Sequence, residues 1–180
     1  MSKIALTPNA SGTGTLTIAA PNTSTDRTLT LPDSTGTIDT LQRAGNVLQV
    51  VHGSTKTNVT TTTTTSTDTG LSASITPSST SSKILVLVSQ NVFLYGASTI
   101  SGNIYLYRDS TRVNTDTNYG IWTVTATELQ VIYSINHLDS PATTSSVTYK
   151  TQQQLRDGPA MRTQRDSGFT STITLMEIAA

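Results

Sequence analysis

Threonine and serine restrict the folds open to this chain more than any other feature of its sequence. Of the 180 residues, 38 are Thr and 22 are Ser, whereas Glu occurs only twice and Lys four times. Threonine is β-branched and suits the pleated surface of a sheet, and the residues that usually fill helices are scarce. The composition therefore predicts an all-β protein with no helix of ordinary length.

The charge balance and the lack of cysteine exclude several classes of function. Only 12% of the residues are charged and the formal net charge is zero, so the chain offers no basic surface to nucleic acid or an anionic membrane. Without cysteine there are no disulfides and no thiolate metal sites. No segment approaches the ~20 apolar residues of a membrane-spanning helix, and the N-terminus lacks the apolar run of a secretion signal. We expect no nucleic-acid partner and no membrane insertion.

Two short alternating phrases set residues 1–45 apart as an extended arm. TLTIAAP at 15–21 and TLTLP at 28–32 alternate Thr with Leu or Ile, and each ends at a proline. Strands this short do not stay folded alone, and proline fits strand ends and edges. The regular apolar stripe favours an arm that pairs with another surface over a disordered Thr-rich leader. The residues expected to carry docking and assembly are Leu16, Ile18, Leu29, Leu31, Pro32 and Ile38.

The remaining residues, 46–180, have the pattern of a β-sandwich. About eight alternating segments separated by turn signals predict two packed sheets, with a jelly roll as the eight-strand form. The expected strands are 47–51, 56–67, 71–76, 83–96, 102–110, 128–138, 145–154 and 171–178. The segment 56–67 contains six consecutive threonines, and an exposed edge strand is favoured there over a flexible spacer. Near Leu175 and Met176 the alternation slips, which predicts a bulge or two buried faces.

The chain offers no recognisable catalytic constellation. His52 and His137 lie in or beside expected strands without the spacing of a metal site. Glycan cleavage usually needs two facing carboxylates, but the only glutamates, Glu128 and Glu177, lie within strands, and loop aspartates more often make turns. We therefore expect a protein that is not an enzyme, with no catalytic residues, no metal and no cofactor.

The loop region around 109–122 is the best candidate for binding. Its alternating Asn114, Asp116 and Asn118 resemble the spacing of a calcium loop, but the glycine and the final Glu of such a loop are missing. Trp122, the only tryptophan, is more typical of a sandwich core, whereas an exposed aromatic face beside Asn and Asp side chains can bind sugars. The candidate receptor-binding residues are Asp109, Arg112, Asn114, Asp116, Asn118, Tyr119 and Trp122.

Residues 13–38 resemble a segment common in tailed-bacteriophage structural proteins, particularly fibres. The matching phrases are TLTI–AP followed by TLTLPD–TGT. Further along, LSASITPSSTSSKILVLVS and STITLMEI resemble the small β-sandwich heads that end such fibres. These heads are similar in outline to the trimeric jelly rolls of the tumour-necrosis-factor and complement-C1q type. The resemblance implies a virion-anchoring or trimerisation arm at 1–45 and a trimeric jelly-roll-like head at 46–180.

The resemblance also implies a function and partners. It points to a virion protein, assembled in the host cytoplasm, whose arm contacts tail, baseplate or capsid proteins and whose head meets a glycan or protein of the host surface. A short tail fibre or appendage fits the length of the chain, and a decoration or cement protein of the capsid is the alternative. A glycan-degrading spike is disfavoured, because it requires loop aspartates of neighbouring chains to meet in a cleft.

Overall fold

The computed structural model describes residues 11–15, 17, 22, 24–26, 43–96, 99–114, 120–124 and 128–180. The chain divides into two compact units, residues 1–38 and 39–180, and the second unit, the head, contains every described strand. The sequence pattern had placed this boundary a few residues later. The residues predicted to carry docking in the arm lie outside the described residues: Leu16, Ile18, Leu29, Leu31, Pro32 and Ile38. Across the described residues, no helix has the length and hydropathy needed to cross a membrane.

The described part of the head contains strands and turns but no helix, as the composition predicted. Its strands are β1 (Val47–Thr55), β2 (Val59–Thr61), β3 (Thr67–Ile75), β4 (Lys83–Tyr95), β5 (Ile100–Arg108), β6 (Thr111–Arg112), β7 (Ile121–Thr123), β8 (Glu128–Asp139), β9 (Val147–Asp157), β10 (Ala160–Thr163) and β11 (Ser171–Ile178). They form two antiparallel sheets. The all-β class is therefore confirmed.

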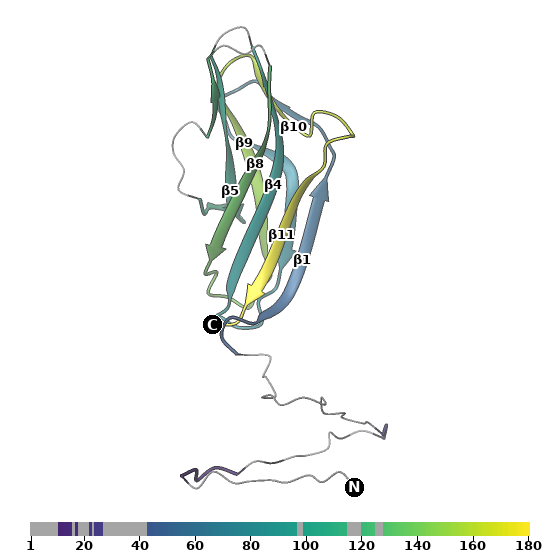
Figure 1. Cartoon of the computed structure of the whole chain (residues 1–180), viewed down its shortest axis with the longest axis vertical. Helices are drawn as coiled ribbons and strands as arrows, with labels where there is room; N and C mark the ends of the chain where they lie inside the picture. Colours follow the sequence, from purple (N-terminus) through teal and green to yellow (C-terminus); the bar gives the residue numbers. More distant parts are fainter. Residues whose placement is uncertain are drawn as a thin grey trace. The chain divides into compact units, whose positions relative to one another are not determined.

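The first sheet is organised around the long strand β4. β8 pairs along one edge of β4, while β11 and β10 pair end to end along the other edge (Figure 1). β1 pairs with β11 and β2 pairs with β10, so these two strands complete the outer edge. The C-terminus lies at the end of this sheet where β1 begins and β11 ends (Figure 1).

The second sheet has the order β3, β9, β5, and both β6 and β7 pair with the far edge of β5. Three pairs of strands each lie end to end along one edge and occupy a single position in their sheet: β1 with β2, β6 with β7, and β10 with β11. The eleven described strands therefore occupy eight positions. Numbered along the chain, these positions run 1-8-3-6 in the first sheet and 2-7-4-5 in the second. This is the strand order of a jelly roll, so the jelly-roll-like sandwich that the pattern predicted is confirmed.

The core lies between the two sheets and follows the strand alternation. Leu71, Ala73 and Ile75 in β3 point inward and are buried, as their alternation with serine predicted. From the other strands, Tyr149 in β9 and Leu175 in β11 are fully buried in the same cluster. Burial of this apolar surface is the main stabilising contribution to a domain of this size.

Several hydroxyl and amide side chains form a hydrogen-bonded layer within the core. The hydroxyl oxygens of Thr69 and Thr151 lie 2.5 Å apart, and Thr151 donates to Gln90 Oε1 at 2.8 Å. Gln90 Nε2 in turn donates to Ser171 Oγ at 3.0 Å. The layer links β3 and β9 of one sheet to β4 and β11 of the other, and pairing makes buried polar groups tolerable. Part of the excess of hydroxyls therefore lies in the core.

The threonine run only partly forms the predicted strand. Its first residues belong to β2, which pairs with β10 over three residue pairs, and the chain bends at residues 63–65 before β3 begins. β2 lies in the first sheet and β3 in the second, so the run spans the crossing between the sheets. A crossing segment cannot remain paired in one ladder, which is why the strand ends early.

The last strand shows neither of the alternatives predicted near Leu175 and Met176: it has no bulge there, and only one of its two faces is buried. The side chains of β11 alternate regularly between buried and partly buried positions, and its register with β1 and β4 continues through Leu175 and Met176. The irregularity lies in β1 instead, between Val47 and Gln49. Because β11 is paired on both edges, its neighbours impose an even register, whereas β1 lies at the edge of the sheet and can take up an extra residue.

Candidate functional site

The outer face of the first sheet carries an apolar surface that the isolated chain leaves exposed. Val50 lies opposite Met176, Met176 opposite Leu85, and Leu85 opposite Leu138, so one row of apolar side chains crosses β1, β11, β4 and β8. Val50 is 57% exposed and Leu138 is 55% exposed. These four residues are named the apolar row.

Other exposed apolar side chains lie on the same face, and Ser134 and Asn136 separate the one on β8 from the apolar row. Ile132, further along β8, is 66% exposed, and Val47 at the start of β1 is 52% exposed. An exposed row of apolar side chains often marks contact with another protein surface. The edge strand β8 borders it, and an edge strand presents unpaired backbone groups to a partner. This face is therefore a candidate assembly surface.

The predicted receptor-binding loop is held against the second sheet by its own polar groups. Asp109 adopts a positive φ of 53° in the turn after β5, and its Oδ1 accepts a hydrogen bond from the Thr148 amide at 2.9 Å. Asn114 is buried, and its Oδ1 accepts from the Leu106 amide at 2.9 Å. The Arg112 guanidinium carbon lies 3.7 Å from the centroid of the Tyr105 ring. Each of these side chains stabilises the loop, and their receptor-binding role remains a prediction.

Trp122 does not enter the core, contrary to the expectation for a single tryptophan in a sandwich. It is 58% exposed, because its neighbour Ile121 takes the inward position and is buried. The register of β7 with β5 places Trp122 opposite Ser101, with its side chain on the outside. The structure therefore leaves Trp122 accessible to a ligand. Asp116, Asn118 and Tyr119, the other predicted loop residues, lie outside the described residues.

A chain of hydrogen bonds beneath the loop was not visible in the sequence. The Gly120 amide donates to Asn103 Oδ1 at 2.6 Å, and Asn103 Nδ2 donates to the Tyr105 hydroxyl at 2.8 Å. The Tyr105 hydroxyl donates to Gln154 Oε1 at 2.7 Å. Asn103 and Tyr105 are buried although they point away from the core; Gly120 bonds to Asn103, and Arg112 lies over the Tyr105 ring. The end of the loop is thus anchored to the sheet.

Glu177 lies at the end of the head where β1 begins, and it is fully buried. Its carboxylate accepts hydrogen bonds from Gln49 Nε2 at 2.6 Å and from the Ser78 amide and hydroxyl, both at 2.7 Å. Burial alone raises the pKa of Glu177, but the hydrogen bonds from Gln49, Ser78 and Ser82 outweigh it and lower the pKa to about 2. The ionised carboxylate joins β11, β1 and the β3–β4 turn.

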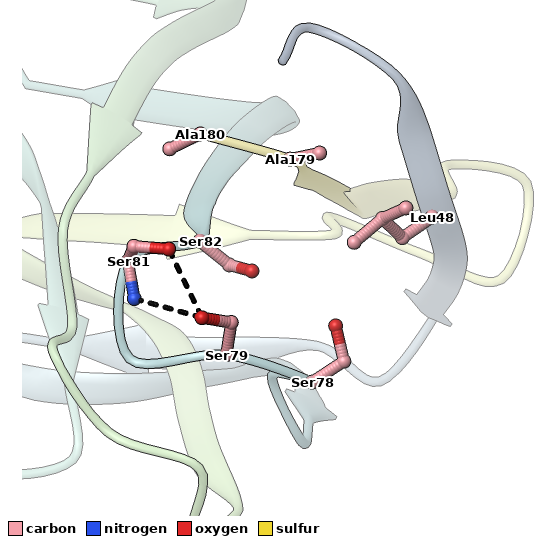
Figure 2. A pocket seen from close by; sticks show the side chains of 7 residues that line it. All are labelled: Leu48, Ser78, Ser79, Ser81, Ser82, Ala179 and Ala180. Atoms are coloured by element: carbon pink, nitrogen blue, oxygen red, sulfur yellow. Dashed lines mark hydrogen bonds between the residues drawn. The ribbon is translucent and has the colours of Figure 1, made fainter. Parts of the chain in front are cut away.

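A shallow pocket beside this carboxylate is too small for an organic ligand. It lies between Leu48, the serines of residues 78–82 and the C-terminal Ala179 and Ala180, and its volume is about 110 Å³ (Figure 2). Ser79 and Ser81 bond to each other within its wall (Figure 2). Pockets for small ligands are typically ~300 Å³ or larger. This pocket is therefore not a binding site for a sugar or cofactor.

The two glutamates cannot act together on a glycosidic bond. Glu128 pairs with Tyr95 and Glu177 with Ile84, near opposite ends of β4, about 35 Å apart along the strand. Carboxylate pairs that cleave glycans lie ~5–10 Å apart. Within the described residues, no three His, Asp or Glu side chains gather as metal ligands. His52 Nδ1 lies 3.1 Å from the Thr174 hydroxyl on the outer sheet face.

An acidic side chain joins the two sheets at the other edge of the sandwich. Asp139 Oδ2 accepts hydrogen bonds from Arg108 Nη1 and from the Tyr149 hydroxyl, both at 2.6 Å. Burial and the Asp139 carboxylate raise the pKa of Tyr149, so the hydroxyl stays protonated and donates. Because Asp139 belongs to β8 and the donors to β5 and β9, the contact ties the two sheets together.

Sequence reasoning also missed a cluster of arginines and aromatic rings at the far end of the first sheet. Arg162 in β10 and Arg165 after it lie over the rings of Tyr95 and Phe93. The only sequence signal was the spacing of two arginines in MRTQRDSG, which does not show what they contact. Strand pairing between β10 and β4 brings them to the aromatic rings.

No protein-family profile matches this chain, and no curated protein matches it either. Function is therefore inferred from the sequence pattern and from the surfaces of the head. The surfaces that stand out are the apolar row, the loop with Trp122, and the arginine cluster.

Proposed function

We propose that this chain is a non-enzymatic structural protein of a bacteriophage virion, a short tail fibre or appendage whose head attaches to the host surface. The resemblance of residues 13–38 to phage structural proteins supports the virion role. The apolar row carries the assembly part of the proposal, because a head that exposes it needs a protein partner. The protein is assembled in the host cytoplasm and functions in the virion.

The partner that we propose for the apolar row is two further copies of the same chain. Around a three-fold axis, the apolar row of each subunit can be covered by a neighbouring subunit. Because this symmetry is closed, no apolar row is left exposed. The arm then contacts tail, baseplate or capsid proteins, or the arms of the sister chains. The short proline-ended strands of the arm gain partners in either arrangement.

The loop on the second sheet is the part of the head that we propose to meet the receptor. Trp122 is exposed there, and Arg112 is held over the Tyr105 ring at the same sheet edge. Aromatic faces beside polar side chains suit a glycan or a protein of the host envelope. A trimer that packs through the first sheet leaves this second sheet facing outward.

The test is competition for host adsorption. Purified protein added to host cells before the phage is expected to reduce adsorption, and labelling of intact particles is expected to place the protein on the tail or baseplate. Failure of the protein to bind host envelope preparations would contradict a role in attachment.

A decoration or cement protein of the capsid is the second candidate. The apolar row favours it as well, because a capsid surface can cover that row as effectively as a sister subunit. This function predicts that particles lacking the protein lose stability to heat or low salt and still adsorb normally. Density for the head across capsomer junctions would favour it over the attachment function.

A further inference from the structure

Two arginines and two aromatic rings form a cluster on the outer face of the first sheet. The ring centroids of Phe93 and Tyr95 lie 5.7 Å apart near the end of β4. The guanidinium carbon of Arg165 lies 4.3 Å from the Phe93 centroid, and that of Arg162 lies 5.1 Å from the Tyr95 centroid. Arg162 Nη2 also donates to the Tyr95 hydroxyl at 3.2 Å. These four residues are named the arginine cluster.

Among the residues that the structure describes, the positive charges of this cluster have no carboxylate partner. Within the described residues, no ion pair involves Arg162 or Arg165, whereas Arg108 is paired with Asp139. Glu128 reaches the same face opposite Tyr95 but is not ion-paired with either arginine. Asp166, next to Arg165 in sequence, directs its Oδ1 to the Gly168 amide at 2.8 Å.

The guanidinium groups are held in place by ring faces, and their geometry suits an oxyanion. A guanidinium donates in a planar fork that matches a carboxylate or phosphate, and a stacked guanidinium loses less freedom when it binds. Neutral hydrogen-bonding groups flank the pair: Gln130 lies opposite Phe93 on β8, and Thr60 lies opposite Arg162 on β2. Such a mixture of charged and neutral donors suits an acidic sugar.

The cluster lies at the end of the head opposite to the point where the chain enters it. The chain enters the head beside its C-terminus, where two backbone hydrogen bonds hold it. The Gly45 amide donates to the Ala179 carbonyl at 2.8 Å, and the Ala179 amide donates to the Asn46 carbonyl at 2.9 Å. β4 runs from this end to Tyr95 over 13 residues, which spans about 40 Å. A head attached through its N-terminal side therefore presents the cluster at its far end.

The arginine cluster lies far enough from the apolar row along β4 to stay exposed when the row is covered. The row crosses β4 at Leu85, near the entry end, whereas Phe93 and Tyr95 lie near the other end of the strand. Subunits that pack through the row bring their arginines to the rim of the assembly. Burying several unpaired guanidinium groups between subunits is disfavoured, so the rim stays open to solvent or to an anion.

We propose that Arg162 and Arg165 form a subsite for the carboxylate or phosphate group of an acidic host-surface polysaccharide. The inference rests on the proposed attachment function and names its ligand class. It assigns the first contact with the host to the far end of the first sheet, in addition to the loop that carries Trp122. The aromatic rings position the arginines, and the anion supplies the charged acceptor that no described residue provides.

The test compares two double variants of the full-length protein that lose the same charge. Arg162→Gln with Arg165→Gln removes the cluster, and Lys83→Gln with Lys150→Gln removes two positive charges elsewhere on the head. Binding is measured at low salt to polygalacturonate, to inorganic polyphosphate and to uncharged dextran. We expect wild-type binding to at least one anionic polymer, a loss of about tenfold or more in the arginine variant, and little change in the lysine variant.

Two further measurements keep the test decisive. The single variant Arg165→Gln changes an exposed residue, so a loss of binding there with unchanged thermal melting supports the subsite. Arg162→Lys with Arg165→Lys keeps the charge but not the planar fork, and is expected to bind more weakly than wild type. Equal binding by wild type and the arginine variant, equal losses in both double variants, or equal binding to dextran would overturn the proposal.

Adsorption competition separates this proposal from the attachment function. If the arginine variant blocks phage adsorption as well as wild type does, the attachment function stands and the subsite is wrong. If wild type binds the anionic polymer through the arginines but does not block adsorption, the arginines bind anions as proposed, but the attachment function and the host-surface ligand are both wrong.

Discussion

Glutamine in place of Glu177 is expected to destabilise the head at neutral pH and to remove much of its sensitivity to acid. The pKa of Glu177 falls from 4.5 to about 2 in the folded head, because three neighbours donate hydrogen bonds to its buried carboxylate. At about 1.4 kcal/mol for each pH unit, this difference corresponds to about 3 kcal/mol of stability. The carboxylate is fully buried, so solvent screens this contribution little.

The sign of the effect follows from the lowered pKa. Stability from Glu177 is fully present above the unfolded pKa of 4.5 and is lost as the pH falls from there towards about 2. Wild type and Glu177→Gln should therefore differ by about 3 kcal/mol at pH 7 and converge near pH 2. In thermal melts at pH 7 the variant should unfold about 6 to 12 °C earlier.

Urea unfolding between pH 7 and pH 2, at matched protein concentration, measures this difference. Glu128→Gln is the matched control, because Glu128 is the other glutamate of the chain and lies exposed at the start of β8. It should leave stability nearly unchanged across the range. A Glu177→Gln variant as stable as wild type at pH 7, or a deficit that does not shrink in acid, would refute the reasoning.

Three other substitutions test the remaining contacts. Leu138→Asp places a charge in the apolar row at a side chain that is 55% exposed, so light scattering should show a monomer where wild type has three times the chain mass. The variant should still unfold cooperatively, at a lower temperature because the stabilisation from association is lost. A monomeric wild type at micromolar concentration would contradict the trimer. Asp139→Asn weakens the bonds from Arg108 and Tyr149 and should lower the free energy of unfolding by about 2 to 3 kcal/mol in urea. Trp122→Ala should leave melting unchanged and reduce binding to host envelopes, and equal binding would remove Trp122 from the receptor surface.

Much of the fold was accessible from local sequence patterns. The excess of threonine and the alternation of Leu71, Ala73 and Ile75 with serine identified strands and their buried faces, since period-two alternation is a local property. The same reasoning identified the final strand and the turn at Asp109. It was only partly right at the threonine run and was wrong near Leu175 and Met176, because pairing with neighbouring strands decides the structure at both places.

The candidate surfaces depended on the tertiary structure to a greater degree. Val50, Leu85, Leu138 and Met176 are far apart in sequence, and only the register of four strands brings them into one row. Register between strands is a long-range property that no local pattern reports. The candidate binding loop was chosen from its composition, which did not show that Asn114 is buried.

The sequence by itself determined that this chain is a β protein with a separate N-terminal segment, because side-chain shape and alternation act within a few residues. The tertiary structure alone decided the jelly-roll order, the exposure of Trp122 and the burial of Glu177. Each of these depends on which strand lies beside which, and packing between distant segments sets that arrangement.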